Sequence, residues 1–320
     1  MVWTRRMLRN RVTFFSAEPE ACHVAILAGV HGNERAGFFA FERLFEALQR
    51  GPLLRGKLSL IPGNVQAAQK KRPSRTAAGQ DMNRLFDTPE RALAQGLTPE
   101  GPDWERAQQL LPILREVDVL LDLHSTSTPS EPFAIVRSLD SKRLDLLRGM
   151  PVSRVDYGYD RVLPGCTMQV VDNRGGLAIT VECGEHRQGL GDGGRLAYRC
   201  AVALLHNLGM LKTTTPSTQS PTRALELVYR GLVAHPPSLE YAPGFRSGAP
   251  VAWGQLVARD ETRDYVAPTK LETEQILGHE ITCDGPLQAL MVTPRQRVAQ
   301  VLPHDAFLLG MPHELTGPTA

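Results

Sequence analysis

The sequence predicts an α/β fold in which a mixed central sheet is flanked by helices, followed by a smaller C-terminal all-β domain. Three observations support this prediction. Apolar, β-branched runs at 24–28, 117–123 and 177–184 are typical of buried strands. After the first run, apolar residues recur at three- and four-residue steps over 34–48, which predicts a helix. Beyond residue 222, short apolar segments are separated by Gly and Pro, a pattern typical of β structure.

Length and composition exclude several classes of protein. The chain has 320 residues, of which 42% are hydrophobic and 22% charged, as in ordinary globular proteins. The net charge of +2 argues against a protein that binds nucleic acid by neutralising phosphates. No apolar run approaches the ~18 residues that span a bilayer. The basic N-terminus lacks a signal-peptide core, and five cysteines without paired spacing suit a reducing compartment. We therefore expect a cytoplasmic protein without nucleic-acid or membrane partners.

The expected domain organisation has three parts. Residues 1–212 form the large α/β domain, 213–222 form a linker rich in Ser, Thr and Pro, and 223–320 form the small β domain. The remaining elements of the large domain are predicted in chain order. They are an edge strand at 11–15, strands at 57–62 and 131–136, helices at 104–114, 141–148 and 195–211, and a substrate-facing loop at 153–177.

The junction between the first strand and the first helix carries two side chains that can bind a metal. His31 and Glu34 follow the apolar run 24–28 across a turn with two glycines and an asparagine. In open α/β sheets, ligands bind at the carboxyl ends of the strands. A His-x-x-Glu pair also occurs by chance on helices, so this motif alone is weak evidence for a metal site.

A third metal ligand is predicted at the end of the strand at 117–123. His124 stands at the end of this strand, as His31 stands after the first one. Asp122, two residues earlier, points to the same face of the strand as His124 and can orient its imidazole. Two His and one Glu with an open position form the ligand set of hydrolytic zinc sites. The sequence thus predicts one Zn²⁺ per chain held by His31, Glu34 and His124. Alternatively, His124 is a polar strand-end residue that bonds to the Ser/Thr-rich loop after it.

Glu182 lies in the last apolar strand of the large domain. A glutamate buried in such a run is costly unless it is paired or functional. We interpret Glu182 as the general base, which takes a proton from water and passes it to a leaving amine. An ion pair with a nearby Arg or Lys is the structural alternative. Cys183 beside it is interpreted as a small strand residue rather than a nucleophile, because no acid–base partner adjoins it.

Four short motifs in this order resemble those of the aspartoacylase/succinylglutamate desuccinylase family, a branch of the zinc carboxypeptidase superfamily. Together they span about residues 20–190. The motifs are His31-Gly-Asn-Glu34, Asp81-Met-Asn83-Arg84-Leu-Phe86, Asp122-Leu-His124 and Val181-Glu182-Cys-Gly184. The resemblance implies a zinc carboxypeptidase-like fold and a zinc-dependent amidohydrolase. Such a deacylase cleaves an N-acyl amino acid or a similar small carboxylate-bearing amide, releasing a carboxylate and a free amine.

The resemblance also implies substrate-binding residues. Asn83 and Arg84 match the pair that holds a substrate carboxylate, and an upstream arginine polarises the scissile carbonyl. We assign that arginine as Arg75, with Arg72 as the alternative, because a guanidinium binds oxyanions in a planar, bidentate manner. Arg174 is assigned to substrate binding, although it is displaced from the family position. A tyrosine that the family contributes from its C-terminal domain has no counterpart here, so neither family substrate is assigned.

Two further functions are considered. A small-peptide metallocarboxypeptidase would use the same ligands, but in the family the C-terminal β domain narrows the entrance against long peptides. A catalytically silent, metal-binding relative would have lost Glu182 or a ligand, and none is lost. The oligomeric state, monomer or homo-oligomer, is left open.

Overall fold

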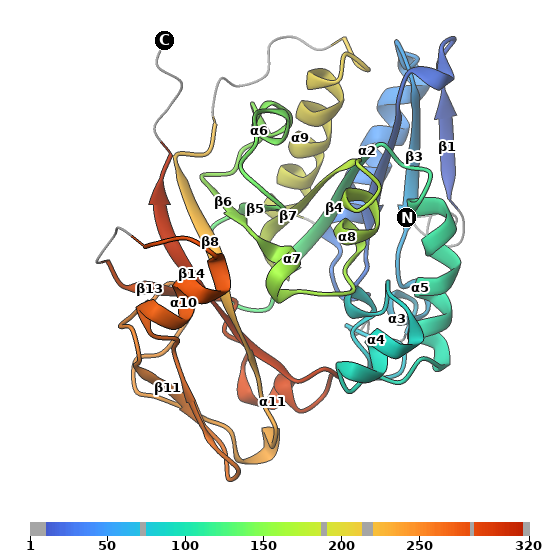
Figure 1. Ribbon diagram of the computed structural model, residues 1–320. Coiled ribbons are helices and arrows are strands. Elements are labelled where there is room, and N and C mark those ends of the chain that lie inside the picture. Colours follow the sequence, from blue (N-terminus) through green and yellow to red (C-terminus); the bar gives the residue numbers. More distant parts are fainter. Residues whose placement is uncertain (1–10, 71–74, 187–190, 213–219, 282–284, 316–320) are drawn as a thin grey trace.

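The computed structural model describes residues 11–70, 75–186, 191–212, 220–281 and 285–315. Its main feature is an eleven-stranded mixed sheet in the order β1-β3-β2-β4-β7-β5-β6-β8-β14-β13-β10, with helices on both faces (Figure 1). A separate three-stranded antiparallel sheet has the order β12-β11-β9. The predicted fold class, a mixed central sheet flanked by helices, is confirmed.

The middle of the sheet consists of parallel strands that are buried on both faces. The four parallel strands are β3 (Lys57–Pro62), β2 (His23–Ala28), β4 (Val119–Thr126) and β7 (Leu177–Glu185). Every residue of β2 and β4 is buried, which explains why both strands contain apolar runs without alternation, 24–28 in β2 and 119–121 in β4. Antiparallel pairing begins on either side, with β1 (Val12–Phe15) on β3 and β5 (Phe133–Val136) on β7.

Successive residues of β2 point into two different cores. Val24 and Ile26 pack with the face covered by α2 (Ala36–Arg50), α6 (Ser141–Leu147) and α9 (Asp192–Asn207). Ala25 and Leu27 pack with the face covered by the helices α5 (Gly101–Leu114), α7 (Tyr159–Val162) and α8 (Thr167–Asp172). Two short helices, α3 (Val65–Ala68) and α4 (Pro89–Ala94), lie in the connections.

The expected loop at 153–177 is wrong. The structure has β6 (Arg154–Tyr157), α7 and α8 in this segment. These elements have four to six residues each, so none completes enough turns or alternations to produce a readable periodicity.

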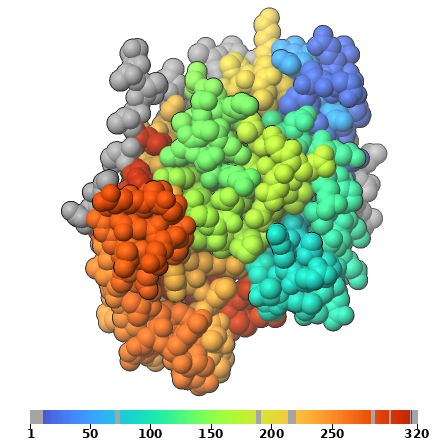
Figure 2. All heavy atoms as spheres, viewed as in Figure 1, coloured from blue at the N-terminus to red at the C-terminus, as the bar shows by residue number. Residues whose placement is uncertain are grey.

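The C-terminal strands extend the central sheet. β8 (Arg223–Leu232) pairs in parallel with β6, and β14 (Asp305–Glu314) pairs with β8. Figure 2 shows the orange C-terminal segments beside the green middle of the chain. The domain limits at 212 and 223 stay a prediction, and residues 213–219 of the expected linker lie outside the described ranges. The other C-terminal elements are β9 (Glu240–Tyr241), β10 (Pro250–Val251), β11 (Leu256–Arg259), β12 (Asp264–Val266), α10 (Lys270–Leu277), β13 (Leu287–Leu290) and α11 (Arg295–Val298).

One of the short apolar segments beyond residue 222 that were expected to form strands comprises residues 281–283. Most of it lies outside the described residues. Within the described ranges, the helices all lack the length and apolar character that a bilayer span requires.

Candidate functional site

The candidate site lies where the strands β2, β4 and β7 end. His31 follows β2 after a turn at Gly29, which has φ +70°. A Cβ atom at this position would lie 2.4 Å from the Phe38 ring, so the turn requires glycine. His124 lies in β4 and pairs in register with Glu182 on the neighbouring strand β7. The parallel arrangement therefore brings residues far apart in sequence to one edge of the sheet.

The three predicted metal ligands form one buried cluster. Glu34 bridges the two histidines, with Oε1 2.7 Å from Nδ1 of His31 and Oε2 3.1 Å from Nδ1 of His124. The potential ligand atoms all lie within 4.8 Å of one another. Each of the three residues is at most 6% exposed. Among the described residues, this is the one group of three or more His, Cys, Asp and Glu side chains close enough to share an ion.

Carboxylates hold both imidazoles from the opposite side. Nε2 of His31 lies 2.9 Å from Oδ1 of Asp81, and Nε2 of His124 lies 3.0 Å from Oδ2 of Asp122. The predicted contact between Asp122 and His124 is thus confirmed. Metal-binding histidines usually donate their second N–H to such a carboxylate, which fixes the tautomer and leaves the other nitrogen free for the metal. Here both Nδ1 atoms lie against the carboxylate of Glu34.

The electrostatics of the cluster favour a cation. Four carboxylates are buried within it, from Glu34, Asp81, Asp122 and Glu182. Burial and, to a smaller extent, the Glu34 charge raise the pKa of Glu182 to about 7, against the opposing effect of the histidines. Burial lowers the pKa of His124, but Asp122 and Glu34 outweigh that effect and hold it well above 6.5. A divalent cation would replace the protons that these carboxylates hold on the histidines, and the nitrogen and oxygen donors suit zinc or another first-row ion.

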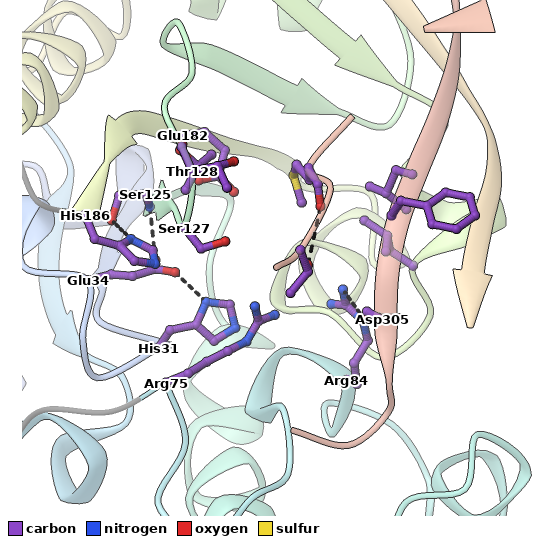
Figure 3. A pocket seen from close by; sticks show the side chains of 16 residues that line it. His31, Glu34, Arg75, Arg84, Ser125, Ser127, Thr128, Glu182, His186 and Asp305 are labelled. Atoms are coloured by element: carbon purple, nitrogen blue, oxygen red, sulfur yellow. Dashed lines mark hydrogen bonds and ion pairs between the residues drawn. The ribbon is translucent and has the colours of Figure 1, made fainter. Parts of the chain in front are cut away.

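A cavity opens beside the cluster (Figure 3). His31, Glu34 and Glu182 form one wall, and the guanidinium of Arg75 projects between this wall and Arg84. The opposite wall comes from the C-terminal segment. Its residues are Met291, Thr293, Asp305, Phe307 and Leu308.

Two arginines connect the cavity to its surroundings. Nη2 of Arg75 lies 2.6 Å from Oδ2 of Asp81, the same carboxylate that holds His31. Arg84 donates from Nη1 to the backbone oxygen of Asn83 at 2.6 Å, and its Nη2 lies 3.2 Å from Oδ2 of Asp305. Asp305, in β14, also accepts from Nε of Arg230, in β8, at 2.6 Å, so it connects Arg84 to two C-terminal strands.

The structure does not bring all the predicted substrate residues together. Asn83 is absent from the residues described as lining the cavity; its Oδ1 instead accepts from the Thr167 backbone N–H at 3.0 Å. Arg174 is exposed on the surface near Arg115, at the opposite edge of the sheet, where β7 begins. Arg72, the alternative to Arg75, lies outside the described residues.

Several cavity residues had no catalytic or binding role in the sequence interpretation, and two of them, His186 and Asp305, are titratable. His186 contacts Ser125, with 2.9 Å between its Nδ1 and Oγ, and the Ser125 N–H donates to Oε2 of Glu34 at 3.1 Å. His186 is four residues after Glu182, so the motif around Glu182 is the sequence signal that could have identified it. Asp305 belongs to no motif and enters the cavity only because β14 pairs with β8, so no local signal could have identified it.

Comparisons with known proteins agree with this geometry. The chain matches solved structures, including a succinylglutamate desuccinylase from Vibrio cholerae with a TM-score of 0.68 at 16% identity, covering 96% of this chain and 86% of that one. A succinylglutamate desuccinylase/aspartoacylase from Rhodobacter sphaeroides gives 0.61 at 18%, covering 96% and 89%. The product-bound ectoine utilization protein EutE (DoeB) from Ruegeria pomeroyi gives 0.56 at 20%, covering 81% of each chain. At these identities the likeness concerns the fold.

The comparison with curated proteins gave no match. The sequence model of the succinylglutamate desuccinylase/aspartoacylase catalytic domain matches residues 20–192. This region contains β2, β4 and β7 and every residue of the buried His–Glu–His cluster. The chain therefore belongs to the succinylglutamate desuccinylase/aspartoacylase family.

Proposed function

We propose that this chain is a zinc-dependent amidohydrolase that removes the acyl group from an N-acyl amino acid or a similar small, carboxylate-bearing amide. The family consists of hydrolases of amide bonds. The observation that carries the proposal is the arrangement of the two histidines, whose Nδ1 atoms both face Glu34 while carboxylates hold both Nε2 atoms. This is the environment that histidines have when they bind a metal.

His31, Glu34 and His124 would hold one zinc ion per chain. When bound, zinc supplies Lewis-acid activation of water and of a carbonyl oxygen. The same residues also suit other first-row divalent ions, so the choice of zinc follows from the donor set together with the family.

Glu182 would act as the general base. It is 6% exposed and lies beside His124 across the β4–β7 pair, at the wall of the cavity. Burial raises its pKa to about 7, so its carboxylate can accept a proton from the attacking water and return it to the leaving nitrogen near neutral pH.

The two cavity arginines would bind the substrate. Arg75 reaches the cavity next to the cluster, where a guanidinium can stabilise the negative charge that develops on the scissile carbonyl oxygen. Arg84 lines the opposite part of the cavity and would hold the carboxylate of the amino acid, as the family motif implies. Asn83 would support Arg84 through its backbone carbonyl, which accepts from Nη1. Arg174 is not part of this proposal.

The acyl group and the amino acid are not assigned. The similar structures are named as a succinylglutamate desuccinylase, a succinylglutamate desuccinylase/aspartoacylase and an ectoine utilization protein. These names apply to those proteins and do not identify the substrate of this chain. The C-terminal residues Met291 and Phe307 close one side of the cavity, which favours a small amide over a peptide chain.

The test is hydrolysis by zinc-reconstituted protein of N-acetyl, N-formyl and N-succinyl derivatives of acidic, aromatic and basic amino acids, together with a dipeptide. We expect release of free amine from one group of acyl amino acids, abolished by a chelator. Cleavage of the dipeptide alone would favour the carboxypeptidase function. No cleavage of any compound, with no metal bound, would refute the hydrolase proposal.

A further inference from the structure

The segment 75–80, which carries Arg75, has no helix or strand of its own. It runs irregularly from Arg75 to Gln80 before the short helical turn at Met82–Arg84. Such a segment has no internal ladder of hydrogen bonds to fix its backbone. The position of the Arg75 guanidinium therefore depends on what holds this backbone in place.

A single buried carboxylate binds three of the segment's backbone N–H groups. Asp103, in the first turn of α5, is 0% exposed and accepts four hydrogen bonds. Its Oδ1 accepts from the backbone N–H of Ala77 at 2.6 Å and from Nδ2 of Asn64 at 2.7 Å. Its Oδ2 accepts from the backbone N–H of Ala78 at 2.7 Å and of Gln80 at 3.3 Å. Bonds to an ionised acceptor are roughly twice as strong as neutral ones, and the helix N-terminus favours the negative charge.

Other contacts connect the segment to the metal cluster and to the loop before α5, while Lys70 donates to the Thr76 and Ala77 carbonyls and the Leu302 N–H donates to the Gly79 carbonyl. The Arg75 carbonyl accepts from the Gly32 N–H at 3.2 Å, within the His31–Glu34 motif. The Gln80 side chain donates to Thr98 O at 3.0 Å and Glu100 O at 3.1 Å, and accepts from the Thr98 N–H at 2.7 Å. Asp103 thus fixes the middle of a segment whose first residue adjoins the cluster.

We propose that Asp103 is a positioning residue for Arg75, acting on the reaction through the backbone of 77–80. The inference rests on the proposed function, since it assigns Arg75 to the carbonyl oxygen of the substrate. Asp103 itself is not among the residues that line the cavity. Loss of its charge releases two or three backbone N–H groups and lets Arg75 leave the geometry in which it meets the oxyanion.

Asp103→Asn is the principal variant, since it keeps the side-chain shape and one acceptor oxygen. We expect kcat to fall about tenfold or more, in line with the sensitivity of catalysis to small displacements, while KM and zinc content stay near the wild-type values. In an Arg75→Ala background the same change should reduce kcat no further, because the residue that Asp103 positions is gone.

Hydrogen–deuterium exchange supplies a measurement that does not depend on activity. In Asp103→Asn, amide exchange in 76–80 should accelerate at least tenfold, while exchange in 24–28 stays unchanged. Gln80→Ala removes the second anchor of the segment and should produce a smaller change of the same kind, which preserves the test if Asp103→Asn folds poorly.

Asp172→Asn is the matched control. Asp172 is also a buried carboxylate with several donors, from Arg143, Tyr159 and the Ala178 backbone, but it ends α8 and does not line the cavity. It should lower the melting temperature without lowering kcat.

Two results would overturn the positioning role while the wild-type enzyme is active. One is an unchanged kcat in Asp103→Asn. The other is an equal fold-loss in the wild-type and Arg75→Ala backgrounds, which indicates a general structural effect. Absence of turnover in the wild-type protein is a different result, which refutes the proposed function and the catalytic role of Asp103 with it.

Discussion

The cavity has two walls of different construction. The motif wall consists of His31, Glu34 and Glu182, with His124 behind them in contact with Glu34, at the ends of three buried parallel strands. The C-terminal wall comes from β14 and the segment between β13 and β14. Its residues are Met291, Thr293, Asp305, Phe307 and Leu308. In the motif wall the three ligand side chains contact one another directly, whereas in the C-terminal wall Asp305 contacts Arg84 and Arg230.

This difference leads us to expect that the motif wall carries out the reaction and that the C-terminal wall influences which substrate binds. The buried carboxylates and imidazoles of the motif wall are compatible with burial only as a set, because each charge depends on its partners. The side chain of Asp305 is 20% exposed, so solvent screens its interactions more strongly. We therefore expect changes in the motif wall to affect catalysis and zinc strongly, and changes in the C-terminal wall to affect substrate preference mildly.

The largest effect is expected for Glu182→Gln. Removing a general base costs about 10²–10⁴ in rate, whereas the three ligands and their carboxylate partners are unchanged. We expect kcat to fall in that range with one zinc retained per chain, measured by steady-state kinetics and metal analysis. Persistence of wild-type turnover would remove Glu182 from the mechanism.

The next effect concerns the stability of the metal-free protein. Burial raises the folded-state pKa of Glu182 to about 7, against 4.5 for an ordinary glutamate. The folded state therefore binds a proton that the unfolded state has released, so stability falls as pH rises from about 4.5 to 7. Glu182→Gln removes this loss, so the free energy of unfolding of the variant should exceed that of the wild type by about 3 kcal/mol at pH 8 and by almost nothing at pH 4.

Urea denaturation of both proteins without zinc, at several pH values, measures this difference. Repeating the titration with zinc is the control, since a nearby cation favours the carboxylate and should shrink the difference. A stability difference that does not vary with pH would contradict the shifted pKa.

A smaller effect is expected at Asp122, which holds the Nε2 of His124. Asp122→Asn should weaken zinc affinity by about 10–100-fold, the usual cost of losing such a partner. Asp118→Asn is the control, because Asp118 is an exposed carboxylate just before the start of the same strand. Competition with a chelating dye measures both affinities, and equal affinities would show that Asp122 does not tune the site.

The smallest effect is expected in the C-terminal wall. Asp305 competes with a substrate carboxylate for Arg84, so Asp305→Asn should lower KM for carboxylate-bearing amides by about fivefold, the worth of a partly exposed ion pair. Zinc content and kcat should stay near wild type. Loss of zinc in this variant would show that the two walls are not independent.

The same division explains what the sequence could predict. His31, His124 and Glu182 each follow or end an apolar β-branched run, so their approach at one sheet edge follows from parallel pairing. The contact between Asp122 and His124 also followed from strand alternation. Local patterns carried enough information for this wall.

The remaining site depends on packing between distant segments. Asp305 reaches Arg84 only through the β8–β14 pairing, and Asp103 meets the segment 75–80 because α5 packs beside it. The short elements β6, α7 and α8 escaped detection for a related reason, since tertiary contacts rather than periodic patterns define them. Arg174 was assigned to substrate binding although it is displaced from the family position, and the structure has it on the surface.

The most direct test of the account is X-ray absorption spectroscopy of the zinc-loaded protein, with His124→Ala as the comparison. We expect a shell of nitrogen and oxygen at about 2.0–2.1 Å with two imidazoles in the wild type. In His124→Ala, one imidazole should be lost from any zinc that still binds. A sulfur ligand at about 2.3 Å, or an unchanged imidazole count in the variant, would show that zinc binds elsewhere and would contradict the proposed site.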